Sequence, residues 1–190
     1  MKVLCRVCLS ATLFFMVASA AIAQQRVHAL SGTVTAILPK IAMTNVQVDD
    51  GNSVHFYWRK ASDGPIEFDK NVNADAIAAD KFATNAAHVI VYYFGDGDVR
   101  TAVALHDLGN GPMEQKSGAV VKFNRHDHLL TIKNGSGAEE SFHIDAKTVT
   151  DTATGVAEKF KFDFSKGDQV RVTAAMANGS GTALLITQGM

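Results

Sequence analysis

An internal repeat constrains the fold of this chain more than any other feature of its sequence. The first copy opens at residue 31 with SGTVTAIL, and the second opens at residue 117 with SGAVVKFN. Four further segments match in the same order: 46–51 with 130–135, 54–58 with 141–144, 86–93 with 167–174, and 95–105 with 178–186. One short match arises easily by chance, whereas five in order indicate two copies of roughly 70–75 residues each.

Each copy has the two-residue period of half-buried strands, for example at residues 46–48 and 130–132. Asp-Gly at 50–51 and Asn-Gly at 134–135 predict hairpin turns, because these residue types tolerate positive φ. Only residues 73–83 are typical of a short helix. Each copy therefore has about five short strands, with a variable segment before the fourth. This arrangement is typical of the OB fold. A β-sandwich is the rival, but the short repeat favours compact barrels. We expect an all-β fold of two tandem five-stranded OB-like barrels.

The repeat also predicts the domain boundaries. We expect the first OB-like repeat at residues 31–106 and the second at residues 117–187. The segment between them, 107–116, contains Gly-Asn-Gly-Pro and is typical of a linker.

The first 23 residues predict a secretory signal peptide. Lys2 and Arg6 precede an apolar stretch, and the stretch ends in the small-residue exit Ala21-Ile22-Ala23. The apolar run is shorter than the roughly 20 residues that span a bilayer, so a membrane anchor is the weaker interpretation. Both cysteines, Cys5 and Cys8, lie in this leader, so the mature chain would have no disulfide and no thiol nucleophile. We expect a periplasmic or secreted protein.

Charge and hydropathy narrow the possible partners. The formal net charge of the full chain is −1, and loss of Lys2 and Arg6 with the leader would make the mature chain more acidic. The sequence has no Lys/Arg cluster that predicts a phosphate-binding face, which argues against nucleic acid as a partner. No later segment predicts a transmembrane span.

The second copy carries a recognisable pattern. It has Gly118-x-Val120, then FSKGDQVRV at 164–172, then Gly181-x-Ala183. Over residues 117–187 this resembles the secreted bacterial OB-like repeat domains of unknown function. The first copy keeps Gly32-x-Val34 but has Ala-His at 87–88 in place of the Gly-Asp step. The resemblance implies a barrel fold and brings no catalytic residues with it.

A cluster of polar residues at 126–128 raises the possibility of a metal site. His126 and His128 flank Asp127, and histidines two residues apart can bind a transition metal together. A third ligand would be required, and His143 on the predicted third strand is the nearest candidate. The other interpretation is a solvated turn between two strands, because tight turns are normally exposed and polar.

Consecutive aromatic residues crowd the first copy. We predict a binding surface formed by Phe56, Tyr57, Trp58, Tyr92 and Tyr93, because the exposed strands of OB barrels can stack sugars or bases. The alternative is that these side chains fill the contact between the two barrels, or lie under the insertion at residues 59–72.

The sequence predicts no catalytic residue and no cofactor. His106 precedes Asp107, an arrangement that can orient an imidazole, but no nucleophile motif accompanies it, so a hydrolase is a remote third possibility. We expect a non-enzymatic binding or interaction module whose partner is an unknown protein, glycan or small molecule. The alternative is a periplasmic metal-binding protein that uses His126 and His128.

Overall fold

The computed structural model of the chain describes residues 26–48, 51–60, 75–97, 100–157, 162–177 and 180–189. These residues form strands and turns, with one short 3-10 turn at Pro39–Ile41, which confirms the all-β prediction. The expected leader at 1–23 and residues 61–72 of the insertion lie outside the described residues. In the described part, no helix has the length and apolar character needed to cross a membrane.

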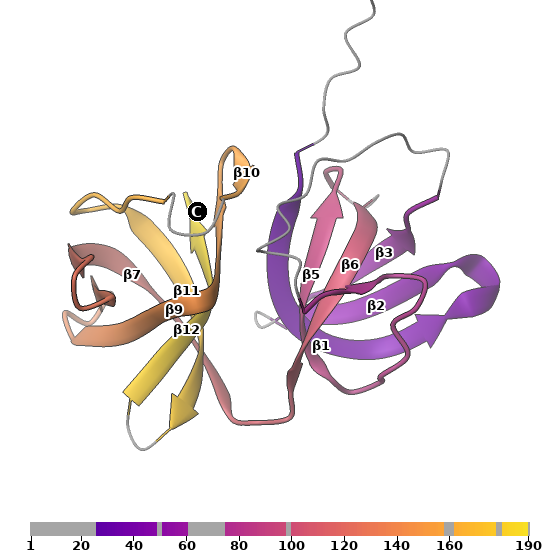
Figure 1. The fold of residues 1–190 in the computed structure, drawn as a ribbon, viewed down its shortest axis with the longest axis horizontal. Coiled ribbons are helices and arrows are strands. Elements are labelled where there is room, and N and C mark those ends of the chain that lie inside the picture. The colour runs from indigo at the N-terminus through magenta and orange to yellow at the C-terminus, as the bar shows by residue number, and fades with distance from the viewer. Residues whose placement is uncertain are drawn as a thin grey trace, which may run out of the picture.

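The first six strands of the described residues form one sheet, which we call the N-terminal unit (Figure 1). They are β1 (His28–Leu38), β2 (Met43–Val48), β3 (Ser53–Trp58), β4 (Ile77–Ala78), β5 (His88–Phe94) and β6 (Arg100–Gly109). The strands are hydrogen-bonded in the order β3-β2-β1-β5-β6-β4. The sheet also curls round, so that β3 pairs with β6 in parallel over three residue pairs.

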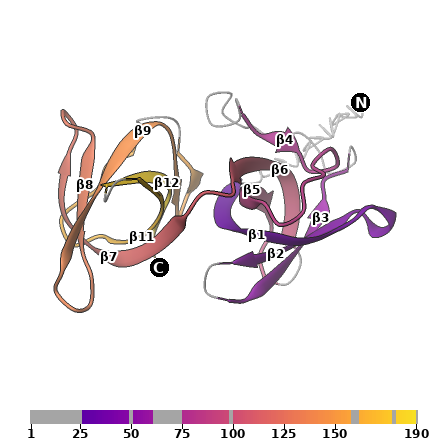
Figure 2. The same ribbon diagram turned by 90° about the horizontal axis from the view of Figure 1, so that it is seen from below.

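The other six strands form the C-terminal unit. They are β7 (Met113–Asn124), β8 (Leu129–Lys133), β9 (Glu139–Thr152), β10 (Gly155–Val156), β11 (Gln169–Ala177) and β12 (Ser180–Gln188). The order is β10-β9-β12-β11-β7-β8, and β8 also pairs with β9 over five residue pairs. This last pairing closes a five-stranded barrel, whose ring of strands is visible in Figure 2.

The two units repeat one strand order. Without the two-residue strands β4 and β10, each unit has five strands. The first of these lies between the second and fourth, and the third pairs in parallel with the last. A register shift follows Val34 in the first strand of one unit and Val120 in the first strand of the other. Gly32 and Gly118 lie two residues before these shifts. At Gly32 a Cβ would lie 2.5 Å from the carbonyl oxygen of Gln47, and at Gly118 a Cβ would similarly overlap the carbonyl group of Lys133. The repeated glycines therefore allow close approach of the neighbouring strand.

The helix predicted at 73–83 is wrong for the residues that the structure describes. Ile77 and Ala78 pair with β6 as strand β4, and turns follow. Ala79 and Phe82 are buried in the core of the N-terminal unit. Pairing with β6 and burial of Phe82 outweigh the helix propensity of the alanines, as tertiary contacts often do. The linker is also shorter than predicted, because β6 continues to Gly109 and β7 begins at Met113.

Each unit has its own apolar core. Among the described residues, the N-terminal core contains ten that are buried, for example Val34, Phe56 and Leu105. The core of the barrel contains twelve, among them Leu130 and Val172. A third apolar cluster lies outside both interiors and holds the two units together.

Candidate binding cleft between the two units

The third apolar cluster is built from the outer faces of both sheets. Its buried members from the N-terminal unit are Val27, Ala29, Ile90, Tyr92 and Ala104, and those from the C-terminal unit are Val149 and Leu185. Strand β1 contacts β9, β10 and β12 there, and Figure 1 shows the two units side by side, with a short connection between β6 and β7. We call this contact region the junction.

Polar bonds cross the junction beside the apolar cluster. The Ser31 and Thr173 hydroxyls are 2.6 Å apart and both side chains are buried. The backbone N–H of Val156 donates to the carbonyl of Val27 over 2.7 Å. Thus the junction is polar and apolar together, and the polar groups restrict how the two sheets can be arranged.

An acid–histidine pair also joins the two units. His28 Nδ1 lies 3.1 Å from Asp151 Oδ1, and Asp151 is only 5% exposed. Burial raises the pKa of Asp151 from its ordinary value to about 6, although the nearby His28 opposes this rise. The aspartate is therefore a titratable group within the junction, close to neutral pH.

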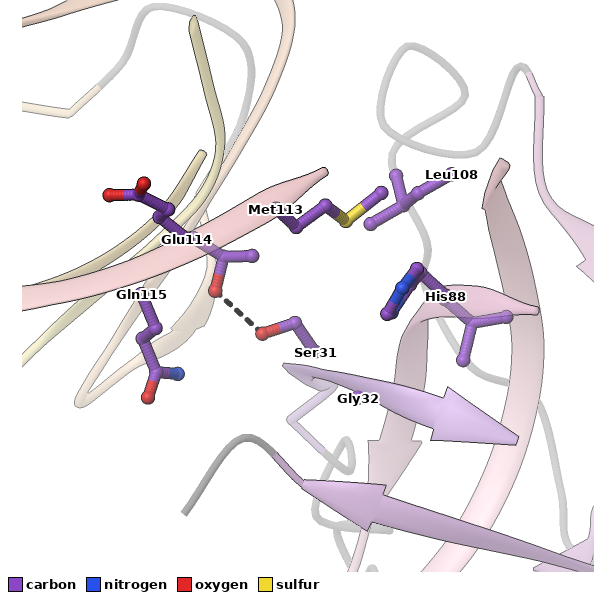
Figure 3. Close-up of a pocket in the computed structure, with 9 residues that line it drawn as sticks. Ser31, Gly32, His88, Leu108, Met113, Glu114 and Gln115 are labelled. Atoms are coloured by element: carbon purple, nitrogen blue, oxygen red, sulfur yellow. Dashed lines mark hydrogen bonds between the residues drawn. The ribbon is translucent and has the colours of Figure 1, made fainter. Parts of the chain in front are cut away.

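The Ser31–Thr173 contact separates two clefts of about 380 Å³ each. The first opens beside the connection between β6 and β7 and is shown in Figure 3. His88 and Met113 project into it from β5 and β7. The Thr33 hydroxyl bonds to His88 Nδ1 over 3.0 Å and fixes the orientation of the imidazole.

The second cleft, which we call the arginine cleft, carries the stronger chemical signature. Its polar lining residues are Ser31, Asn52, Tyr93, Arg100, Gln115, Asp151, Arg171, Thr173 and Thr187. Its apolar lining residues are Ala29, Leu30, Val48, Val54 and Leu185. Both units contribute to both sets, so the cleft exists only when the two units are docked.

Three of its side chains have defined surroundings. The Arg100 guanidinium lies 5.1 Å from the centroid of the Tyr93 ring, a cation–π distance. The same ring contacts Phe56, with centroids 5.5 Å apart. Burial raises the pKa of Tyr93, and Arg100 partly offsets this rise. Arg171, on β11, has a buried Nε–H with no hydrogen-bond acceptor in the part of the chain that the structure describes.

The predicted aromatic surface is divided among four environments. Phe56 lies in the N-terminal core and Tyr92 in the junction, both 0% exposed, so neither belongs to an exposed surface. Tyr92 thus lies in the contact between the two units, the position that the alternative gave it. Trp58 is partly buried against the core, and its indole N–H donates to the Thr44 hydroxyl over 2.8 Å. Only Tyr93 reaches the arginine cleft, while Tyr57 is 46% exposed elsewhere.

The predicted histidine cluster forms an exposed turn between β7 and β8. The Asn124 side chain accepts the N–H of His126 over 3.0 Å, and His128 has the positive φ of 51° that ends the turn. His143, on β9, pairs in register with Leu129. Among the described residues, no group of three or more His, Cys, Asp or Glu side chains is placed to hold a metal ion. The structure therefore does not assemble His126, His128 and His143 into a three-ligand site.

The possible His106–Asp107 pair is likewise not assembled for base catalysis. Asp107 Oδ1 accepts the backbone N–H of Gly109 over 2.8 Å. Burial lowers the pKa of His106, so its neutral form is favoured.

Comparison with known proteins identifies no relative. No family model matches the sequence, and no curated protein is similar to it.

Of the residues that line the arginine cleft, only Tyr93 was identified from the sequence. Arg100 and Arg171 lie in different copies, and neither belongs to a charged run. The available signal was in β11, where Arg171 and Thr173 alternate with the buried Val170 and Val172. That pattern places both polar residues on the outer face of the barrel, but it does not reveal that another sheet covers this face.

Proposed function

We propose that this chain is a periplasmic or secreted, non-enzymatic binding module, in which two OB-like barrels form one ligand site between them. In this proposal the ligand binds in the arginine cleft, and not on the aromatic strands of the first copy alone. The observation that carries the proposal is that both units line this cleft, with two guanidinium groups and an aromatic ring beside apolar side chains. Ligand sites commonly combine apolar walls with a few polar groups at domain interfaces.

The shared strand order supports the assignment of OB-like barrels to both units. With the short strands β4 and β10 left out, both units have the ring order 3-2-1-4-5, in which the third and last strands pair in parallel. The paired glycines Gly32 and Gly118 give the two first strands the same close approach to a neighbour. The resemblance to secreted bacterial OB-like repeat domains is consistent with this assignment. In the proposal the two barrels are two copies of one repeat, and the junction exists only where the two are packed together.

Several bonds support a binding role over a catalytic one. The Ser31 and Thr173 hydroxyls bond to each other, and Asp107 binds a backbone N–H instead of orienting His106. Nucleophilic catalysis needs a hydroxyl or thiol within hydrogen-bond reach of a base. The Thr33–His88 pair has this geometry, but His88 lines the first cleft and neither residue lines the arginine cleft. The cleft side chains instead present donors, acceptors and apolar surface, which are suited to recognition.

The test is a chemical-shift map of protein produced from the full chain. Nitrogen-15-labelled protein is titrated with a panel of neutral sugars, amino acids, short peptides and small organic acids. We expect binders to shift the backbone amides of Leu30, Arg171 and Thr187, which belong to cleft residues from both units. The amides of Thr131, on β8, and of Ser141, which pairs with Thr131, should not move, since β8 is far from the junction in Figure 2.

A variant separates cleft binding from surface binding. Tyr93→Leu removes the ring that Arg100 covers but keeps an apolar side chain against Phe56. It should weaken every binder found in the panel, whereas Tyr57→Leu, at an exposed position outside the cleft, should weaken none. Shifts that map to the surface around Tyr57, or a panel without any binder, would contradict the proposal.

A further inference from the structure

We infer that the arginine cleft selects small organic anions, and that Arg171 is the residue that holds the anionic group. This rests on the proposed function and specifies the ligand class of the same site. The inference comes from three observations: a buried donor without an acceptor, a local excess of positive charge, and an apolar wall next to both.

The first observation is that one hydrogen-bond donor of the Arg171 guanidinium has no acceptor among the described residues. This donor is the Nε–H, and it is buried. A buried donor without a partner is unfavourable, and a guanidinium favours oxyanions because its donors match two oxygens at once. Arg171 is on a barrel strand, paired with Thr187 on one side and Ser117 on the other. The backbone at Arg171 is therefore ordered before a ligand binds, so no loop has to be ordered on binding.

The second observation is the balance of charge in the cleft. Arg100 and Arg171 both line it, and neither forms an ion pair with a carboxylate in the part of the chain that the structure describes. Asp151 is the one carboxylate among the lining residues that the structure describes, and it is paired with His28. The described lining thus has two guanidinium groups against one aspartate that already has a partner, while the exposed Asp96 acts on Tyr93 from outside the lining. Such a cleft attracts negative charge.

The third observation is the size and the apolar part of the cleft. A volume of about 380 Å³ is at the small end of ligand pockets, which range from about 300 to 1,000 Å³. Leu30, Val54 and Leu185 supply apolar contact. A bare inorganic ion would use only the guanidinium groups, whereas a compact organic acid would use the apolar wall as well. The ligands expected to bind share an oxyanion group attached to an organic molecule about the size of a monosaccharide.

The experiment is calorimetric titration at low ionic strength with glucuronate, benzoate, inorganic phosphate and sulfate, and with glucose as the neutral counterpart of glucuronate. We expect glucuronate or benzoate to bind, more tightly than phosphate or sulfate, and glucose to bind more weakly than glucuronate. Arg171→Met should reduce the affinity for the organic acid by about 10- to 100-fold, the usual effect of losing a charge-assisted hydrogen bond. The matched control, Arg125→Gln, removes one positive charge from an exposed ion pair with Asp163 and should leave the affinity unchanged.

The melting temperature gives a second readout. Because Arg171→Met removes an unpaired buried donor, the ligand-free variant should melt at the same temperature as the wild type or a few degrees higher. A large drop would mean that Arg171 is required for folding, and Arg171→Lys would then have to bind the acid more weakly without such a drop for the inference to stand. Equal binding of glucose and glucuronate in the cleft would overturn the anion inference but leave the proposed function intact. If none of these probes binds, the anion inference fails, and the chemical-shift panel alone decides the proposed function.

Discussion

At the level of single residues, Asp151 couples protonation to the contact between the two units. Burial raises the pKa of its carboxyl to about 6, so the folded protein holds this proton more tightly than the unfolded chain does. A raised pKa contributes stability that is fully present below the unfolded value and is lost as the pH rises through about 6. Each unit of such a shift corresponds to about 1.4 kcal/mol. Three other titratable or charged residues, His28, Tyr93 and Arg171, lie around the same position.

The loss of stability with rising pH can be tested by comparing the pH dependence of the melting temperature of one variant with that of the wild type. Asp151→Asn removes the titration and keeps the shape of the side chain. The melting temperature of the variant relative to the wild type should be several degrees higher at pH 7.5 than at pH 4.5. Because His28 opposes the rise in pKa, His28→Gln should steepen the pH dependence of the otherwise wild-type protein. A difference between Asp151→Asn and wild type that stays constant from pH 4.5 to 7.5 would contradict the assignment.

At the level of elements, the first strand of each unit depends on its glycine. Gly118→Ala would place a Cβ against the carbonyl group of Lys133 on β8, and a backbone carbonyl cannot move aside as a flexible side chain can. We expect a loss of about 1–3 kcal/mol, as for other overpacked sites, measured by urea unfolding. The control is Gly135→Ala, because a Cβ at Gly135 meets nothing within 4 Å and should change stability little. Equal effects of the two substitutions would show that the close approach of β7 and β8 is not the cause.

Strands were predictable from the sequence because their signals are local. The alternation at 130–132 corresponds to β8, and the segments matched between the copies fall on equivalent strands. The hairpin predicted at Asn134-Gly135 is also present, but positive φ occurs at Gly137, because the Asn134 side chain accepts the N–H groups of Ser136 and Ala138 and lengthens the turn. The segment around Ile77 was mispredicted since its conformation depends on β6, far away in the sequence.

The site was less predictable than the strands because it depends on how two sheets meet. Periodicity showed that Phe56 and Tyr57 point to opposite faces, but not that Tyr92, on an outer face, is covered by the other unit. Arg171 and Asp151 become a site only when β1 docks against β9 and β12. The sequence predicted the parts of each unit, whereas the chemistry belongs to a surface that neither unit has alone.

At the level of the whole molecule, the junction predicts that the two units unfold together. Separation of the two units would expose the seven buried apolar residues described in the junction. It would also break the Ser31–Thr173 hydrogen bond and the His28–Asp151 pair. The chain has one tryptophan, Trp58, and it lies in the N-terminal unit. Its fluorescence therefore reports that unit alone, while circular dichroism reports strands of both units.

This placement allows the coupling to be measured with a substitution in the other unit. Leu130→Ala opens a cavity in the core of the C-terminal barrel and should cost about 2–5 kcal/mol. If the units unfold as one, the midpoint of Trp58 fluorescence in urea should fall together with the midpoint of circular dichroism, although the substitution lies in the other unit. In Leu185→Ala, which weakens the junction itself, the two midpoints should separate. An unchanged Trp58 midpoint in Leu130→Ala would show that the units are independent, and a cleft shared between them would then not be held in one geometry.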